Sequence, residues 1–145
     1  MAVDVNTQTT IARPLAEVAA YVANPDNAPE WYDNIHAAVW RTDPPLAIGS
    51  QIAFQARFLG RQLDYVYEVV EWEPGKRMVM RTADGPFPME TTYSWEAKGP
   101  NATRMHLRNR GNPSGFSRLM APLMSMMMRR ANRKDLKKLS EILER

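Results

Sequence analysis

Phenol and amide side chains at alternating positions are the groups in this sequence best suited to chemistry. Tyr65, Tyr67 and Tyr93 stand in segments where apolar residues recur at every second position, and Asn109 stands in another. A tyrosine hydroxyl or an asparagine amide can hydrogen-bond to a carbonyl group, which serves either to hold a ligand or to polarise it for reaction. The pattern leaves both roles open, and we therefore assign no catalytic residue.

The two histidines, His36 and His106, are expected to lie outside any such site. His36 is out of phase with its neighbour Ile35, and His106 is out of phase with Met105, so both should point away from the core. The sequence has no cysteine, no His-x-x-x-His spacing and no glycine-rich phosphate motif. We therefore expect neither a metal site nor a cofactor.

Composition and charge are typical of one globular domain, which we expect to span residues 1–145. Residues 129–145 carry seven basic and three acidic side chains, against twelve and thirteen elsewhere, so the net charge of +3 comes from the C-terminal end. We interpret this run as the solvated face of a helix. No aromatic residue follows Phe116, which argues against nucleic-acid binding.

The beginning of the chain has no basic and apolar signal segment, and no stretch approaches the ~18 apolar residues of a membrane span. We expect a cytoplasmic protein without a transmembrane segment. The sequence does not indicate an oligomeric state.

Strands and two short helices are predicted for the first third of the chain. Residues 3–11 alternate and are rich in threonine, which is typical of a strand. Pro14 then introduces helical spacing, a second short helix is expected over 26–32, and residues 35–41 are strand-like.

Tight turns predict how the later strands pair. Gly60-Arg61 reads as a two-residue turn, which sets Phe58 opposite Leu63 and Arg57 opposite Asp64. In the same register Ala56 faces Tyr65, and Phe54 faces Tyr67.

Two further hairpins follow the same logic. Pro74-Gly75 pairs Val69 with Met80, and matching faces across residues 99–101 set Trp95 opposite Met105. Opposite charges then coincide on the outer face, where Glu90 meets Arg110. These alignments predict an antiparallel meander with one solvated face.

A long helix is predicted from about Ser114 to the C-terminus, with Pro122 kinking or breaking it. No other segment can cover the apolar face of the sheet, so this helix must do so. The expected fold class is α+β, with a curved antiparallel sheet of six or seven strands around the C-terminal helix and two short helices after the first strand.

The order of several motifs resembles that of START-like (SRPBCC) domains, and most closely the polyketide cyclase/dehydrase-like subgroup. The resemblance covers the whole chain and is carried by Ile11-x-Arg13-Pro14-x-x-Glu17-Val18, Asn24-Pro25, Pro29-Glu30-Trp31, Leu46-x-x-Gly49-Ser50, Glu68-Val69-Val70-Glu71-Trp72-Glu73-Pro74 and the helix ending at Glu144. It implies a helix-grip fold with a cavity between the sheet and the last helix, but it does not fix the activity.

The predicted ligand-binding residues combine the inward strand positions with the apolar side of the last helix. They are Phe54, Phe58, Tyr65, Tyr67, Met80, Thr91, Tyr93, Trp95, Met105, Leu107, Asn109, Met120, Leu123 and Met127. An apolar wall with few hydroxyls suits a lipid-like or aromatic polyketide-like ligand. Alternatively, these side chains only fill a core, and the methionines either pack there or adapt to ligands.

The leading hypothesis is a carrier or sensor of a small hydrophobic ligand. A cyclase or dehydratase using the same cavity is the alternative. A third hypothesis is a protein- or membrane-interaction module, in which the basic, methionine-rich helix makes weak contact with a membrane surface.

Overall fold

The computed structural model describes residues 3–58, 60–85, 87–112 and 120–145. The described elements form an α+β fold, as the sequence predicted. In chain order they are β1 (Val3–Ile11), α1 (Leu15–Ala23), the 3-10 turn η1 (Pro25–Asn27), α2 (Ala28–Trp31), β2 (Ile35–Trp40), β3 (Gln51–Phe58), β4 (Arg61–Glu73), β5 (Arg77–Asp84), β6 (Met89–Ala97), β7 (Thr103–Gly111) and α3 (Ala121–Leu143).

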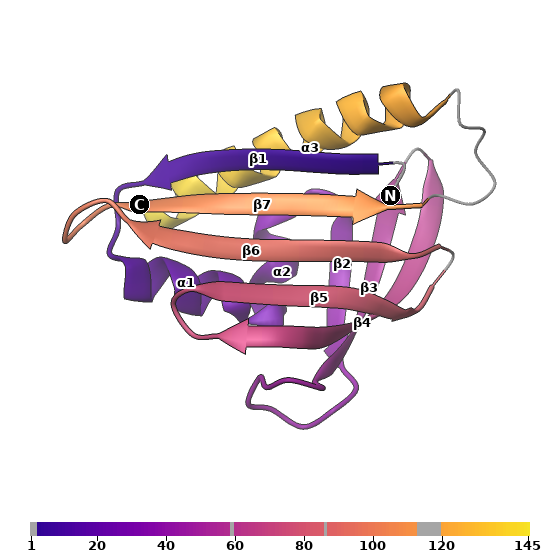
Figure 1. Cartoon of the computed structure of the whole chain (residues 1–145), viewed down its shortest axis with the longest axis horizontal. Coiled ribbons are helices and arrows are strands. Elements are labelled where there is room, and N and C mark those ends of the chain that lie inside the picture. The colour runs from indigo at the N-terminus through magenta and orange to yellow at the C-terminus, as the bar shows by residue number, and fades with distance from the viewer. Residues whose placement is uncertain (1–2, 59, 86, 113–119) are drawn as a thin grey trace.

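The described strands form one antiparallel sheet of seven, in the order β1-β7-β6-β5-β4-β3-β2. Figure 1 shows this sheet curling, with α3 behind it and alongside β1, and with α1 and α2 on the same side. The long helix therefore covers the concave face of the sheet. This is the helix-grip arrangement that the resemblance implied.

Two of the predicted hairpin registers are confirmed. Trp95 pairs with Met105, and Glu90 pairs with Arg110. Val69 pairs with Met80, although the register shifts immediately afterwards, between Val69 and Glu71. Because of this shift Glu71 is about half exposed and binds Arg77 through a 2.9 Å ion pair.

The predicted register of the β3–β4 hairpin was wrong by two residues. Phe58 pairs with Arg61 and not with Leu63, and Leu63 lies opposite Ala56. Gly60, with φ of 75°, therefore occupies the second loop position, where left-handed backbone favours glycine.

The same shift moves two further pairs. Phe54 faces Tyr65 rather than Tyr67, and Asp64 faces Gln55 rather than Arg57. A register shift of two residues keeps every side chain on its predicted face, so the same side chains point inward as predicted.

The helix prediction also needs a correction at its start. Pro122 lies in the first turn of α3, where a proline costs no hydrogen bond, and so it does not kink the helix. The part of the prediction over 114–119 lies outside the described residues.

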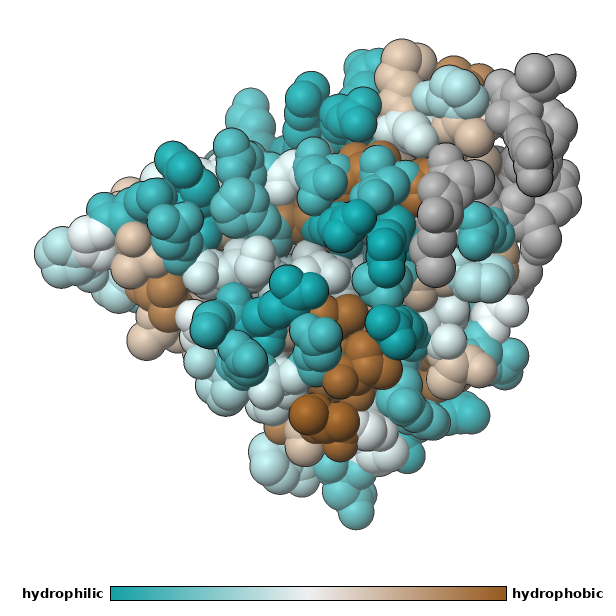
Figure 2. Space-filling model, viewed as in Figure 1, coloured by the Kyte–Doolittle hydropathy of each residue, from teal (hydrophilic) through white to brown (hydrophobic). Residues whose placement is uncertain are grey.

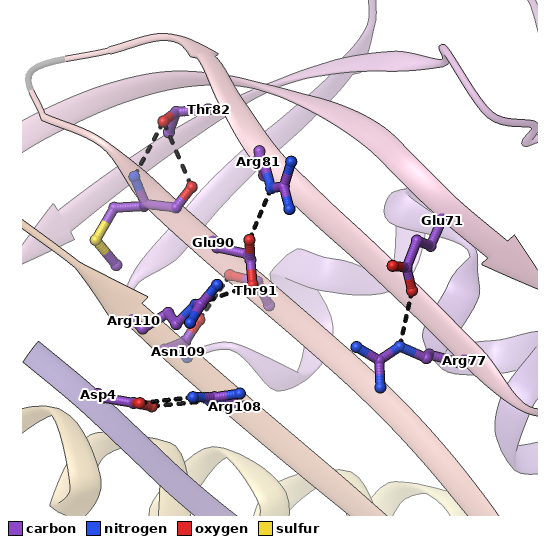
Figure 3. A network of polar contacts seen from close by, with 11 residues as sticks. Asp4, Glu71, Arg77, Arg81, Thr82, Glu90, Thr91, Arg108, Asn109 and Arg110 are labelled. Atoms are coloured by element: carbon purple, nitrogen blue, oxygen red, sulfur yellow. Dashed lines mark hydrogen bonds and ion pairs between the residues drawn. The ribbon is translucent and has the colours of Figure 1, made fainter. Parts of the chain in front are cut away.

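Charged side chains form a ladder on the convex face. Figure 2 shows this face as mostly hydrophilic, with a hydrophobic patch over β4 and β5. Glu90 belongs to the charged ladder and accepts hydrogen bonds from Arg81 at 2.7 Å and from Arg110 at 3.0 Å (Figure 3). Burial by itself would raise the pKa of Glu90, but the hydrogen bonds from the two arginines outweigh it and lower the pKa below its usual 4.5.

Replacing Glu90 with glutamine should therefore destabilise the fold by about 2 kcal/mol at pH 7, because two charge-assisted hydrogen bonds are lost at a buried carboxylate. A lowered pKa gives stability that is present above pH 4.5 and is lost as the pH falls. The difference between E90Q and the wild type in chemical denaturation should thus shrink toward pH 3. E96Q, which removes an exposed partner of Lys98, should change stability by less than about 0.5 kcal/mol. A pH-independent loss in E90Q would contradict this account.

Candidate functional site

A cavity of about 120 Å³ lies between the sheet and α3. Its lining comes from three parts of the chain. The sheet contributes Phe54, Ala56, Leu63, Tyr65, Tyr67, Met80, Met89, Thr91, Tyr93 and Asn109, residues 32–35 contribute Tyr32, Asn34 and Ile35, and α3 contributes Met128, Ala131, Asn132 and Asp135.

Strand alternation and helical periodicity bring these side chains together. On β6 and β7 the inward positions are odd-numbered, which turns Thr91, Tyr93 and Asn109 toward the helix. On α3 the lining residues recur at spacings of three or four, which places them on one side of the helix.

Hydrogen bonds join most of the polar groups on the sheet side of the cavity. Thr91 Oγ1 donates to Asn109 Oδ1 at 2.6 Å, as Figure 3 shows, and the Tyr32 and Tyr93 hydroxyls lie 2.7 Å apart. Burial raises the pKa of Tyr32, Tyr67 and Tyr93. These phenols therefore stay neutral and keep their donor hydrogens at physiological pH.

Asp135 brings a carboxylate into the lining of this cavity. The residue is only 2% exposed, and its Oδ1 accepts a hydrogen bond from the backbone N–H of Asp33 at 3.1 Å. Burial raises the pKa of Asp135 to about 6, and the nearby charge of Asp33 adds to the effect, while the backbone hydrogen bond opposes it. The carboxyl group can thus exchange a proton near neutral pH.

Asn132 carries a polar atom that has no partner among the described residues. The residue is 4% exposed and lines the cavity one helical turn before Asp135, and its Nδ2 makes no hydrogen bond within the described part of the chain. The indole nitrogens of Trp31 and Trp95 also lack a described partner, but these residues do not line the cavity. A buried amide donor in a residue that lines a cavity is a place where a ligand acceptor would be stabilised.

Half of the predicted site residues line the cavity: Phe54, Tyr65, Tyr67, Met80, Thr91, Tyr93 and Asn109. Trp95, Met105 and Leu107 are buried in the packed core instead, because α1 packs against β6 at their end of the sheet. The side chain of Phe58 lies outside the described part of the structure. Neither histidine belongs to the described lining.

The ligand-binding residues predicted on the last helix were wrong. Met120, Leu123 and Met127 are exposed, whereas Met124, on the same predicted apolar side, is buried and Met128 lines the cavity. The phase of the helix is set by Leu136 and Leu139 in its second half, which are 1% and 0% exposed. Steps of four residues back from Leu136 lead to Asn132, Met128 and Met124.

Sequence reasoning missed Tyr32, Met89, Asn132 and Asp135. Asn132 and Asp135 each lie four residues before an apolar core residue, Leu136 and Leu139 respectively. A polar residue in line with the apolar residues of a helix face was the signal that could have predicted these two side chains at the site.

A comparison with protein families gives one decisive match. The family model described as "Polyketide cyclase / dehydrase and lipid transport" matches residues 2–144. The chain belongs to this family. The predicted resemblance to START-like domains of the polyketide cyclase type is thereby confirmed.

Solved structures share the fold of this family member. TTHA0849 from Thermus thermophilus aligns with a TM-score of 0.81 at 18% identity, over 95% of this chain and 94% of that one. The Zhui aromatase/cyclase from Streptomyces sp. R1128 aligns with a TM-score of 0.82 at 13% identity, over 98% of this chain and 93% of that one. A START superfamily protein from Mycobacterium smegmatis aligns with a TM-score of 0.79 at 15% identity, over 97% of this chain and 98% of that one. A search of curated proteins found no significant match.

Proposed function

We propose that this protein binds a small hydrophobic molecule that carries a carbonyl group, and that it acts as a carrier or sensor, with the cytoplasm as its expected location. The observation that carries the proposal is the buried Nδ2 of Asn132, which lacks a described partner and belongs to a residue that lines an otherwise largely apolar cavity. A carbonyl oxygen on the ligand would accept the hydrogen bond that this amide does not make within the described chain. The family description and the label of the Zhui aromatase/cyclase are consistent with a ligand of this kind.

The size of the cavity limits the ligand body. At about 120 Å³ it is close to the ~150 Å³ of an engineered apolar cavity that binds benzene. Phe54, Leu63, Met80 and Met89 supply apolar and aromatic surface for one ring. A single-ring ketone is therefore the simplest probe, and a longer lipid-like or polyketide-like ligand would need α3 to shift.

A paired titration tests the proposal. Acetophenone should bind the wild type more tightly than ethylbenzene, which has similar size but no carbonyl. N132L should weaken acetophenone binding about tenfold by removing the donor, and it should leave ethylbenzene binding equal or tighter. N101L, in the exposed β6–β7 loop, is the matched control and should bind both probes as the wild type does. If N132L lowers the affinity for both probes equally, the amide does not recognise a carbonyl.

Asp135 supports a second candidate, an enzyme of the cyclase or dehydratase type. A carboxyl group with a pKa of about 6 inside the cavity can take a proton from a carbon beside a carbonyl and return it to a leaving hydroxyl. On this alternative, D135N should abolish turnover of a polyketide-like substrate while acetophenone still binds. Equal loss of turnover and binding would favour the carrier.

A further inference from the structure

Four apolar side chains at the start of α3 are exposed. Met120, Leu123, Met126 and Met127 are 40%, 42%, 59% and 36% exposed, although Met124 between them is buried. In Figure 1 the first turns of α3 lie beside β1, near the end of the sheet. Apolar side chains clustered on one surface commonly mark an interaction site.

Basic side chains continue the same side of the helix toward its C-terminal end. Arg130, Arg133, Lys134, Lys137 and Lys138 are all exposed. Lys134 lies 3.6 Å from Asp33, whereas the other four form no ion pair within the described residues. Their helical spacing places them in line with Leu123, Met126 and Met127, and we call this combined surface the α3 outer face.

We propose that the α3 outer face docks on an anionic phospholipid surface. The exposed methionines and Leu123 enter the boundary between headgroups and acyl chains, and the cations lie over the lipid phosphates. An exposed apolar cluster followed by unpaired cations along one helix is the pattern that binds such a surface, since each part supplies one of the two attractions required. No helix in the described ranges is both long and apolar enough to cross a bilayer.

The cavity-lining residues of the same helix give docking a consequence. Met128, which follows Met127 directly, and Ala131, one turn beyond Met127, line the cavity from α3. Docking would therefore place the wall of the cavity directly beside the lipid, where a hydrophobic ligand dissolves. The docking inference itself rests only on the outer face and does not depend on the cavity being a binding site.

Vesicle sedimentation of the full chain tests the inference. The protein should bind vesicles of two parts phosphatidylcholine to one part phosphatidylglycerol, and it should bind pure phosphatidylcholine at least about tenfold more weakly. Binding to the anionic vesicles should weaken as salt is raised.

Two sets of variants separate insertion from charge. The apolar set, L123Q/M126Q/M127Q, and the charge set, R130E/K137E, should each reduce binding at least about tenfold. Their controls carry changes of the same kind at exposed sites elsewhere: the two substitutions V39Q/I48Q for the three of the apolar set, and R57E/K76E for the charge set. Both controls should bind as the wild type, and thermal melting should show that every variant is folded.

Two outcomes would overturn the inference. One is failure of the wild type to bind anionic vesicles. The other is an outcome in which the charge set loses vesicle binding and the apolar set binds as the wild type does. Binding would then need the cations but no insertion of apolar side chains, which describes a general polyanion site, for example for nucleic acid.

Discussion

Replacing Ala131 with leucine should weaken acetophenone binding more than tenfold while changing the free energy of unfolding by less than about 1 kcal/mol. Ala131 lies on α3 and faces the cavity, so the added carbons would enter empty space rather than packed neighbours. Leucine also keeps a high helix propensity. Probe titration and chemical denaturation of the same variant measure the two effects.

Ala19 gives the matched control for this substitution. It is 4% exposed within α1 and belongs to the packed core, and it does not line the cavity. A19L should therefore be overpacked and lose about 1–3 kcal/mol of stability, with probe binding by the folded fraction retained. If A131L is destabilised as much as A19L, the space beneath α3 is ordinary core.

Replacing Asp135 with asparagine should make the protein more stable, by about 2 kcal/mol at pH 8. Burial raises the pKa of Asp135 from its ordinary 3.8 to about 6, so ionisation of this group costs the folded state more than the unfolded state. Stability from this group is fully present below pH 3.8 and declines as the pH rises through 6. Asparagine carries no charge, and its Oδ1 can still accept the hydrogen bond from the backbone N–H of Asp33.

The pH dependence separates this cause from a general improvement in packing. D135N and the wild type should differ most above pH 7 and should converge near pH 3, where Asp135 is protonated in both states. E141Q, at an exposed position of the same helix, should stay within about 0.5 kcal/mol of the wild type throughout. A D135N variant that is less stable at pH 8 would show that the carboxylate is held by favourable contacts. A stabilising substitution at a cavity residue is typical of a site kept for function.

The strand pattern predicted most of the fold because two independent signals had to agree. Across β6 and β7, the register that pairs Trp95 with Met105 also pairs Glu90 with Arg110, so apolar and charged faces support the same alignment. Across β3 and β4 the pattern repeats every two residues, and a slip of two satisfies it equally well. The error at Phe58 followed from this degeneracy, and only the position of Gly60 in the turn could have resolved it.

The candidate site was predictable on its sheet side and not on its helix side. Tyr67, Tyr93 and Asn109 follow from alternation, which assigns each strand residue to one of two faces. The phase of a helix rich in methionine is ambiguous, because Met120, Met124 and Met127 fit one stripe whereas Met124 and Met128 fit another. Only the contacts of the folded helix decide between them.

Asp135 escaped prediction for a related reason. An acid within a basic helix is normally a surface residue, and its burial results from the position of the chain around Asp33, far away in the sequence. Distant segments that meet only after folding leave no local signal.

The central claim is that the cavity beneath α3 takes up a small hydrophobic ligand, and methionine methyl NMR tests it most directly. Addition of acetophenone to protein labelled at the methionine methyl groups should shift the signals of the three cavity methionines, Met80, Met89 and Met128. The signals of Met78 and Met105, which are buried but do not line the cavity, should stay in place. Shifts confined to surface methionines such as Met126, or no shifts up to the solubility limit of the probe, would contradict the claim.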